Sequence, residues 1–200
     1  MNNKVTVDLT GQEKNNCLVI DWIRHTSLQV DGTTCYGHTD VPVSASFEQE
    51  AQQVRSAIEG RNYKAVYTSP LSRAAQLATY CGYPEAIQDN RIMELNFGEW
   101  ETRPWSELMQ GRTLDEWFAT WHQTPPKDGE TLEQFFARVA SFIANVRELY
   151  PTGRVAVFCH GGVINTAAYL RGNISLEGIF RDVPPYGSVN TMVYCNEDKA

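Results

Sequence analysis

The chain has 200 residues, a length typical of one domain, and 42% hydrophobic with 20% charged residues is the composition of an ordinary globular protein. A formal net charge of −7 disfavours non-specific binding to nucleic acid or to an anionic membrane. The chain has no apolar stretch long enough for a bilayer, and its polar first residues do not resemble a secretory signal. We therefore expect a cytoplasmic protein, monomer or homodimer, that acts on a small molecule.

The five cysteines are widely spaced, at positions 17, 35, 81, 159 and 195, and none belongs to a C-x-x-C pair. The odd count and the spacing predict reduced thiols rather than disulfides. Cys159 directly precedes His160, but neighbours in a strand point to opposite faces. We expect Cys159 to be a small buried hydrophobic residue rather than a nucleophile.

Strands and helices are predicted to alternate along the chain. Buried apolar runs predict strands over 17–24, 64–68, 154–159 and 188–195. Apolar residues at helical spacing predict helices from 46 to about 59, over 70–81, from 131 to about 150, and from 161 to about 171. This alternation predicts a three-layer α/β/α sandwich with a mostly parallel sheet.

Helix ends also carry sequence signals. Ser46 and Thr131 each have a glutamine three residues further on, which predicts two capping boxes. Ser69 and Pro70 are suited to the N-cap and the first position of the helix over 70–81. Gly60 predicts the end of the helix that begins at Ser46.

One long segment breaks the alternation. Residues 84–130 hold four of the five tryptophans and several prolines, and they are too many for a simple loop. We expect an inserted cap over the active crevice, with a short helix at about 113–122 and a small aromatic core. Residues 1–16 are expected to be a partly ordered extension, and residues 17–200 a single domain.

Two of the four histidines follow predicted buried strands. Arg24-His25-Thr26 follows the first, and His160-Gly161-Gly162 follows the third. In open parallel sheets, ligands bind beyond the carboxyl ends of the strands. Arg73, in the first turn of the helix over 70–81, is expected to point into the same crevice, where a helix N-terminus favours an anion. We therefore predict one centre that binds a phosphate group.

These residue types are suited to phosphate-ester hydrolysis. A neutral imidazole, the usual form at physiological pH, makes His25 a nucleophile. Arg24 and Arg73 can hold the phosphoryl oxygens through forked donors, and His160 can stabilise charge that develops on them. Gly161 allows backbone amides to approach closely.

The leaving oxygen also needs a proton. Glu94, Glu99 and Glu101 are the candidates, because a carboxyl group near a bound dianion tends to hold a proton. Their spacing does not choose among the three.

Four motifs in order resemble those of the histidine phosphatase superfamily, the phosphoglycerate-mutase-like group: Arg24-His25-Thr26, Thr68-Ser69-Pro70-Leu71-Ser72-Arg73, Glu94-Leu95-Asn96-Phe97-Gly98-Glu99-Trp100 and His160-Gly161-Gly162. The resemblance spans residues 18–172. It implies that His25 is the phosphohistidine nucleophile, that Arg24, Arg73 and His160 form the phosphate pocket, and that Glu94 is the general acid and then the base. It also implies a phosphoglycerate-mutase-like fold and no metal or other cofactor.

Softer features resemble the α-ribazole phosphatase subfamily: Cys35-Tyr36-Gly37-His38-Thr39-Asp40, Trp121-His122-Gln123-Thr124-Pro125 and Gly129-Glu130-Thr131. This resemblance implies hydrolysis of α-ribazole 5′-phosphate in cobalamin nucleotide-loop assembly, with Tyr36 and Gly37 lining the substrate pocket. Thr26 departs from the glycine usual in the superfamily. Its side chain either narrows the pocket or adds a hydroxyl group to the phosphate site.

Two alternatives keep the phosphate site. One is a broad-specificity phosphatase for sugar phosphates, or a mutase, of the same superfamily. A mutase needs further cations in the cap, and those present, Arg91, Arg103, Arg112 and Lys127, do not resemble the mutase pattern. The other is a phosphate-binding module without catalysis, which the full set of reactive residues disfavours.

A metallohydrolase built on His25, His38 and His160 is the third alternative. The sequence has no H-x-x-x-H or H-x-H spacing, which disfavours a metal site. We therefore expect His38 and His122 to be polar loop residues.

Overall fold

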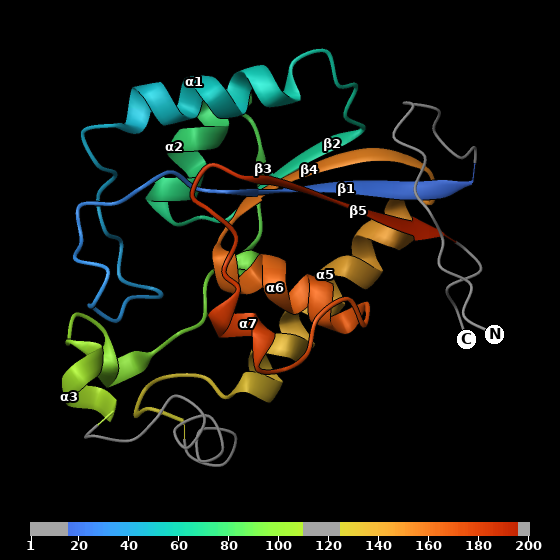
Figure 1. Cartoon of the computed structure of the whole chain (residues 1–200). Coiled ribbons are helices and arrows are strands. Elements are labelled where there is room, and N and C mark those ends of the chain that lie inside the picture. Colours follow the sequence, from blue (N-terminus) through green and yellow to red (C-terminus); the bar gives the residue numbers. More distant parts are fainter. Residues whose placement is uncertain (1–15, 110–124, 196–200) are drawn as a thin grey trace.

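A computed structural model describes residues 16–109 and 125–195. Its strands form one sheet in the order β3-β2-β4-β1-β5 (Figure 1). Their bounds are β1 Cys17–Arg24, β2 Ala65–Thr68, β3 Ile87–Gln88, β4 Gly153–Cys159 and β5 Val189–Cys195. The strands β3, β2, β4 and β1 run parallel, and β5 runs antiparallel to β1. The predicted mostly parallel sheet is confirmed.

Helices cover both faces of this sheet. Within the described residues they are α1 Phe47–Ile58, α2 Ser72–Tyr80, α3 Trp105–Met109, α5 Leu132–Leu149, α6 Gly161–Leu170 and α7 Gly178–Arg181. Figure 1 shows α1 and α2 on one face, and α5 and α6 on the other. This is the three-layer arrangement that the alternating pattern predicts.

Successive side chains of each strand point to opposite faces of the sheet, so the strands contribute to two apolar cores. Ile23 and Phe158 belong to the cluster under α1 and α2, whereas Trp22 and Val157 belong to the cluster under α5 and α6. Because both faces are covered, β1 and β4 need apolar residues in succession. The apolar runs that predicted these strands, interrupted in β1 by Asp21, have this cause.

Two predicted helix starts are wrong in detail. The hydroxyl group of Ser46 donates to the Glu50 carboxylate, so the predicted capping box with Gln49 is absent. Helix α2 begins at Ser72 rather than at residue 70. The Ser69 hydroxyl oxygen accepts from the Leu71 amide at 3.3 Å ahead of the helix and lies 2.8 Å from His160 Nε2. The capping box of α5 at Thr131 is confirmed, with both of its hydrogen bonds formed.

The predicted cap is described only in part. Residues 84–109 carry β3, α3 and the short 3₁₀ turns Asn90–Ile92 and Gly98–Trp100. Trp100 and Trp105 pack against the larger core cluster of the sandwich, and a separate aromatic core of the cap stays a prediction. The predicted helix at 113–122, together with Trp117, Trp121 and His122, lies outside the described residues. The extension and cap boundaries therefore stay predictions.

A buried carboxylate joins three strands of the sheet. Asp21 on β1 is fully buried and forms ion pairs with Arg61 at 2.7 Å and with Arg154 of β4 at 2.9 Å. Burial by itself raises the pKa of Asp21, but hydrogen bonds from Thr191, Arg61 and Arg154 outweigh it and hold the pKa below its ordinary value. Removing either partner would leave a charge in the interior, so the cluster is structural.

The structure contradicts the expectation that all thiols are reduced. Cys17 and Cys195 form a disulfide, while Cys35, Cys81 and Cys159 are buried and free. The pairing of β1 with β5 sets Cys17 opposite Cys195, although 178 positions separate them in sequence. Spacing along the chain could not show this contact. The cytoplasmic expectation loses one support and stays a prediction; no helix among the described residues is long and apolar enough to span a membrane.

The disulfide predicts a large effect of reduction on stability. For a loop of 178 residues, the loss of cross-linking entropy lowers the free energy of unfolding by up to about 5 kcal/mol. Guanidinium unfolding should show this loss for Cys195→Ser or with dithiothreitol, and dithiothreitol should add nothing to Cys195→Ser. Alkylation of the denatured, unreduced protein at all five cysteines would contradict the pairing.

Candidate active site

Three strand ends meet at one edge of the sheet. Beyond β1, the His25 amide donates to the Cys159 carbonyl of β4 at 3.1 Å. Beyond β2, the Ser69 amide donates to the Phe158 carbonyl of β4 at 2.9 Å. Because β4 lies between β1 and β2, His160 emerges between His25 and Ser69.

The predicted convergence is observed. The rings of His25 and His160 have centroids 5.2 Å apart. Arg73 Nε lies 3.3 Å from His160 Nδ1, and the Arg73 charge acts on both imidazoles. All three side chains are almost fully buried. Imidazoles from distant parts of the chain therefore share one centre with a guanidinium.

His25 is oriented as a nucleophile. Its Nδ1 lies 2.8 Å from the Thr26 carbonyl oxygen, which can only accept a hydrogen bond. Nδ1 therefore carries the proton, and in the neutral ring Nε2 keeps its lone pair.

His160 takes the opposite tautomer. Arg73 Nε–H can only donate, so His160 Nδ1 accepts and Nε2–H donates to the Ser69 hydroxyl oxygen. With both nitrogens occupied, His160 orients Arg73 and Ser69. The predicted contact between His160 and phosphate requires Nε2–H to turn away from Ser69, and it stays a prediction. Ser69 is a site residue that sequence reasoning treated only as a helix cap.

Both imidazoles are held neutral. Burial lowers the pKa of His25 well below its ordinary value, and the charges of Arg73 and Arg24 lower it further, against the hydrogen bond to Thr26. Burial and then Arg73 likewise lower the pKa of His160 well below its ordinary value. A lone pair on His25 Nε2 is therefore available at neutral and mildly acidic pH.

Arg73 is a fully buried cation. It donates to the carbonyl oxygens of Gly37 at 2.6 Å and Thr39 at 2.9 Å, as well as to His160. Three of its five N–H groups are thus used by the protein, and two remain for an anion. Burial lowers its pKa, although Glu94 and neighbouring groups raise it.

Arg24 lies beside the start of α6. One of its terminal nitrogens donates to the Pro184 carbonyl, and within the described chain its buried Nε has no hydrogen-bond partner. A Cβ at Gly161 would lie 2.4 Å from Val183 Cγ1 and 3.2 Å from Arg24 Nε. Gly161, predicted to contact substrate, therefore leaves Val183 and Arg24 the room that a side chain would take.

The three candidate acids differ in their position and in their hydrogen-bond partners. Glu94 Oε2 accepts from the Gly162 amide at 3.0 Å, so this carboxylate lies at the α6 N-terminus beside His160. Glu99 is exposed. Glu101 accepts from the amides of His38, Thr39 and Phe97 and from the Thr39 hydroxyl group, and these bonds hold its pKa low although burial opposes them.

Two further predicted residues have clear surroundings. Thr26 is fully buried, and its hydroxyl group has no partner in the described part of the chain, which leaves it able to donate to a ligand oxygen. A Cβ at Gly37 would lie 1.8 Å from the Leu95 carbonyl oxygen, so only glycine fits there. Tyr36, the preceding residue, places its hydroxyl group 2.7 Å from that of Tyr186.

Arg138 on α5 was not predicted as a site residue. Its five N–H groups reach the Glu130 carboxylate twice and the carbonyl oxygens of Arg91, Met93 and Glu94, at 2.6 to 2.9 Å. It thereby fixes the segment from which Glu94 extends. The sequence offers one signal for this role, an arginine beside the apolar stripe of α5.

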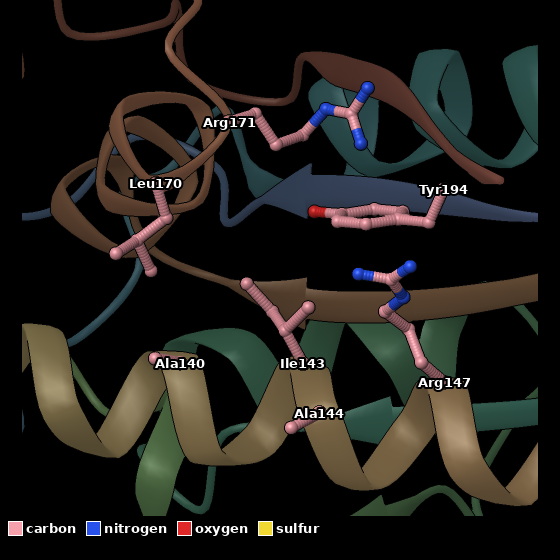
Figure 2. A pocket seen from close by; sticks show the side chains of 7 residues that line it. All are labelled: Ala140, Ile143, Ala144, Arg147, Leu170, Arg171 and Tyr194. Atoms are coloured by element: carbon pink, nitrogen blue, oxygen red, sulfur yellow. The ribbon is translucent and has the colours of Figure 1, made fainter. Parts of the chain in front are cut away.

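A separate hollow of about 510 Å³ lies away from these residues (Figure 2). It is lined by Ala140, Ile143, Ala144, Arg147, Leu170, Arg171 and Tyr194. Figure 2 shows the guanidinium groups of Arg147 and Arg171 on opposite sides of the Tyr194 ring. None of the predicted catalytic side chains lines it.

The metallohydrolase alternative gains no support from the geometry. Within residues 16–109 and 125–195, no three histidine, cysteine or carboxylate side chains are grouped as a metal ion requires.

The family model of the histidine phosphatase superfamily (branch 1) matches residues 21–200. Adenosylcobalamin/alpha-ribazole phosphatase of Escherichia coli (strain K12) is 31% identical over 150 residues, which cover 72% of this chain and 73% of that protein.

Two solved structures share the fold. The alpha-ribazole phosphatase from Shigella flexneri has a TM-score of 0.74 at 24% identity, with 89% of this chain and 94% of that chain covered. The phosphoglycerate mutase from Bacillus anthracis str. Sterne has a TM-score of 0.72 at 19% identity, with 90% and 89% covered. The phosphoglycerate-mutase-like architecture is thus confirmed.

The lowered pKa of His25 predicts its protonation state. Nitrogen-15 NMR of histidine-labelled protein should show His25 as the neutral Nδ1–H tautomer well below pH 6.5, the ordinary range of imidazole. The stability gained by keeping His25 and His160 neutral should be lost as the pH falls below about 6.5, because the unfolded chain then binds more protons. The urea-unfolded protein serves as control, and a His25 midpoint at or above the unfolded value would contradict the prediction.

Proposed function

Because this chain belongs to the histidine phosphatase superfamily, branch 1, we propose that it hydrolyses phosphomonoesters through a phosphohistidine on His25. The observation that carries this proposal is the free Nε2 of a buried, neutral His25 beside Arg73 and Arg24. A phosphate group there would meet two cations and one nucleophile in a site with little water, where charge interactions are strong.

The first step transfers the phosphoryl group. His25 Nε2 attacks phosphorus, an N–P bond forms, and the bond to the leaving oxygen breaks. Arg24 and Arg73 hold the phosphoryl oxygens, and Glu94 gives its proton to the leaving alkoxide. The α6 N-terminus beside Glu94 also favours the negative charge of the phosphate.

The second step returns the enzyme to its starting state. Glu94, now ionised, takes a proton from water as the water attacks phosphorus. The N–P bond breaks, inorganic phosphate leaves, and His25 regains its lone pair. One carboxyl group therefore serves as acid and then as base, with its position set by Arg138 and Gly162.

We assign α-ribazole 5′-phosphate as the substrate. The 31% identity to an adenosylcobalamin/alpha-ribazole phosphatase supports this choice over sugar phosphates. A mutase is the second candidate because the Bacillus anthracis mutase shares the fold. Two of the cap cations are already in ion pairs, which disfavours it: Arg91 is paired with Asp89, and Arg103 with Glu107.

The acid role predicts a leaving-group effect. Glu94→Gln should lower kcat for an alkyl phosphate by about 10²–10⁴-fold, but much less in the transfer step of p-nitrophenyl phosphate, whose leaving group needs little protonation. Phosphorylated His25 should then accumulate in intact-protein mass spectra, and His25→Ala should show neither product nor adduct. The exposed Glu99→Gln is the matched control; an equal loss in that variant would move the acid role away from Glu94.

The substrate assignment predicts the outcome of a phosphate-release panel. The value of kcat/KM for α-ribazole 5′-phosphate should exceed those for ribose 5-phosphate and 3-phosphoglycerate by more than about tenfold. Equal values would favour a broad-specificity phosphatase. Conversion of 3-phosphoglycerate to its isomer without phosphate release would favour the mutase.

A further inference from the structure

Two tyrosines from distant parts of the chain meet over the nucleophile. The hydroxyl groups of Tyr36 and Tyr186 lie 2.7 Å apart, across 150 positions of sequence. The Tyr186 ring centroid lies 5.5 Å from that of His25 and 3.9 Å from the Arg24 guanidinium carbon. The Arg73 guanidinium carbon lies 5.7 Å from the Tyr36 ring centroid. We call this pair the tyrosine cover.

The covered groups are barely accessible. His25 has 2% of its surface exposed, and Arg73 and His160 have none, whereas Tyr186 is 38% exposed. A phosphate ester bound at His25 Nε2 would displace the tyrosine cover from this position. The leaving group of that ester then lies where the cover was, because the in-line attack places it on the far side of phosphorus from His25.

Rotation of the two side chains would be enough to separate the tyrosines. Next to Tyr36, Gly37 has its carbonyl bonded to Arg73 and no room for a Cβ against Leu95. Next to Tyr186, the Gly187 amide donates to the His25 carbonyl at 3.1 Å. Both backbones are therefore held to the site itself, and the tyrosine rings stay at its mouth when the bond between their hydroxyl groups breaks.

We propose that Tyr186, with Tyr36, selects phosphate esters whose leaving group carries a flat aromatic ring. Rings that part by rotation present their faces and edges to a guest, and an aromatic guest pairs with them more favourably than an aliphatic one. The Arg24 guanidinium already stacks on Tyr186, so this ring is held beside the phosphate-binding cation. This inference rests on the proposed phosphatase activity and names the substrate class of the same site.

A matched pair of esters isolates the aromatic contribution. Benzyl phosphate and cyclohexylmethyl phosphate both release a primary alcohol bearing a six-membered ring, and they differ in aromaticity. The wild-type protein should prefer benzyl phosphate in kcat/KM by about three- to tenfold, the range of one aromatic contact. Tyr186→Leu should bring the ratio near one, mainly by raising KM for benzyl phosphate.

Two variants control this experiment. Tyr186→Phe keeps the ring and loses the bond to Tyr36, so it should keep the preference. Tyr80→Leu removes another half-buried tyrosine, on α2, whose ring contacts Phe47 outside the site, and it should leave both rates unchanged. Thermal unfolding of each variant checks that the fold is retained.

The outcomes separate this inference from the proposed function. Hydrolysis of both esters with no wild-type preference, or with a preference that Tyr186→Leu keeps, would refute the role of the tyrosine cover and leave the phosphatase intact. If the wild-type protein releases no phosphate from these esters, from p-nitrophenyl phosphate or from α-ribazole 5′-phosphate, both proposals fail together.

Discussion

A single buried guanidinium organises the site. Arg73 has no exposed surface, and a charge in that position is costly unless its donors are used. Two carbonyl groups of the loop after β1 and one imidazole nitrogen accept from it. Arg73 therefore docks the loop that carries Tyr36. Burial, followed by the charge of Arg73, lowers the pKa of His25 and of His160 and keeps both neutral. The two remaining N–H groups of Arg73 can donate to an anion, so folding and ligand binding depend on the same cation.

The second constraint is the close approach of Arg24 and Glu94 to the backbone at the start of α6. The start of α6 is crowded from two sides, because Gly161 faces Arg24 and Gly162 faces Glu94, whose Oε1 would lie 2.3 Å from an added Cβ. A side chain at Gly161 would displace Val183 and crowd the cation, and one at Gly162 would displace the acid. The glycines that follow His160 thus bring opposite charges to one helix N-terminus, where the amide dipoles favour the carboxylate and a bound phosphate.

Much of this fold follows from local patterns. The apolar runs of β1 and β4 are long because both sheet faces are covered, and such runs can be recognised in the amino-acid sequence alone. The capping box of α5 is local as well, and it was predicted correctly. Errors occurred where a side chain had another partner than the local pattern suggests, which is the nearby Glu50 for Ser46 and a distant group in two other cases. Ser69 serves His160 instead of capping α2, and Cys17 meets Cys195 across the β1–β5 pair.

By itself, the sequence determined the sandwich, the positions of His25 and His160 at strand ends, and the family, because strand period, strand ends and short motifs are local properties. The spacing left Glu94, Glu99 and Glu101 equivalent, with only the family resemblance favouring Glu94, and it did not show what Ser69, Arg138 or Tyr186 contact. Only the tertiary structure decided these, since each depends on a contact between segments far apart in the chain. The tautomers of the two histidines differ in origin: the carbonyl of the adjacent Thr26 sets that of His25, whereas the guanidinium of the distant Arg73 sets that of His160.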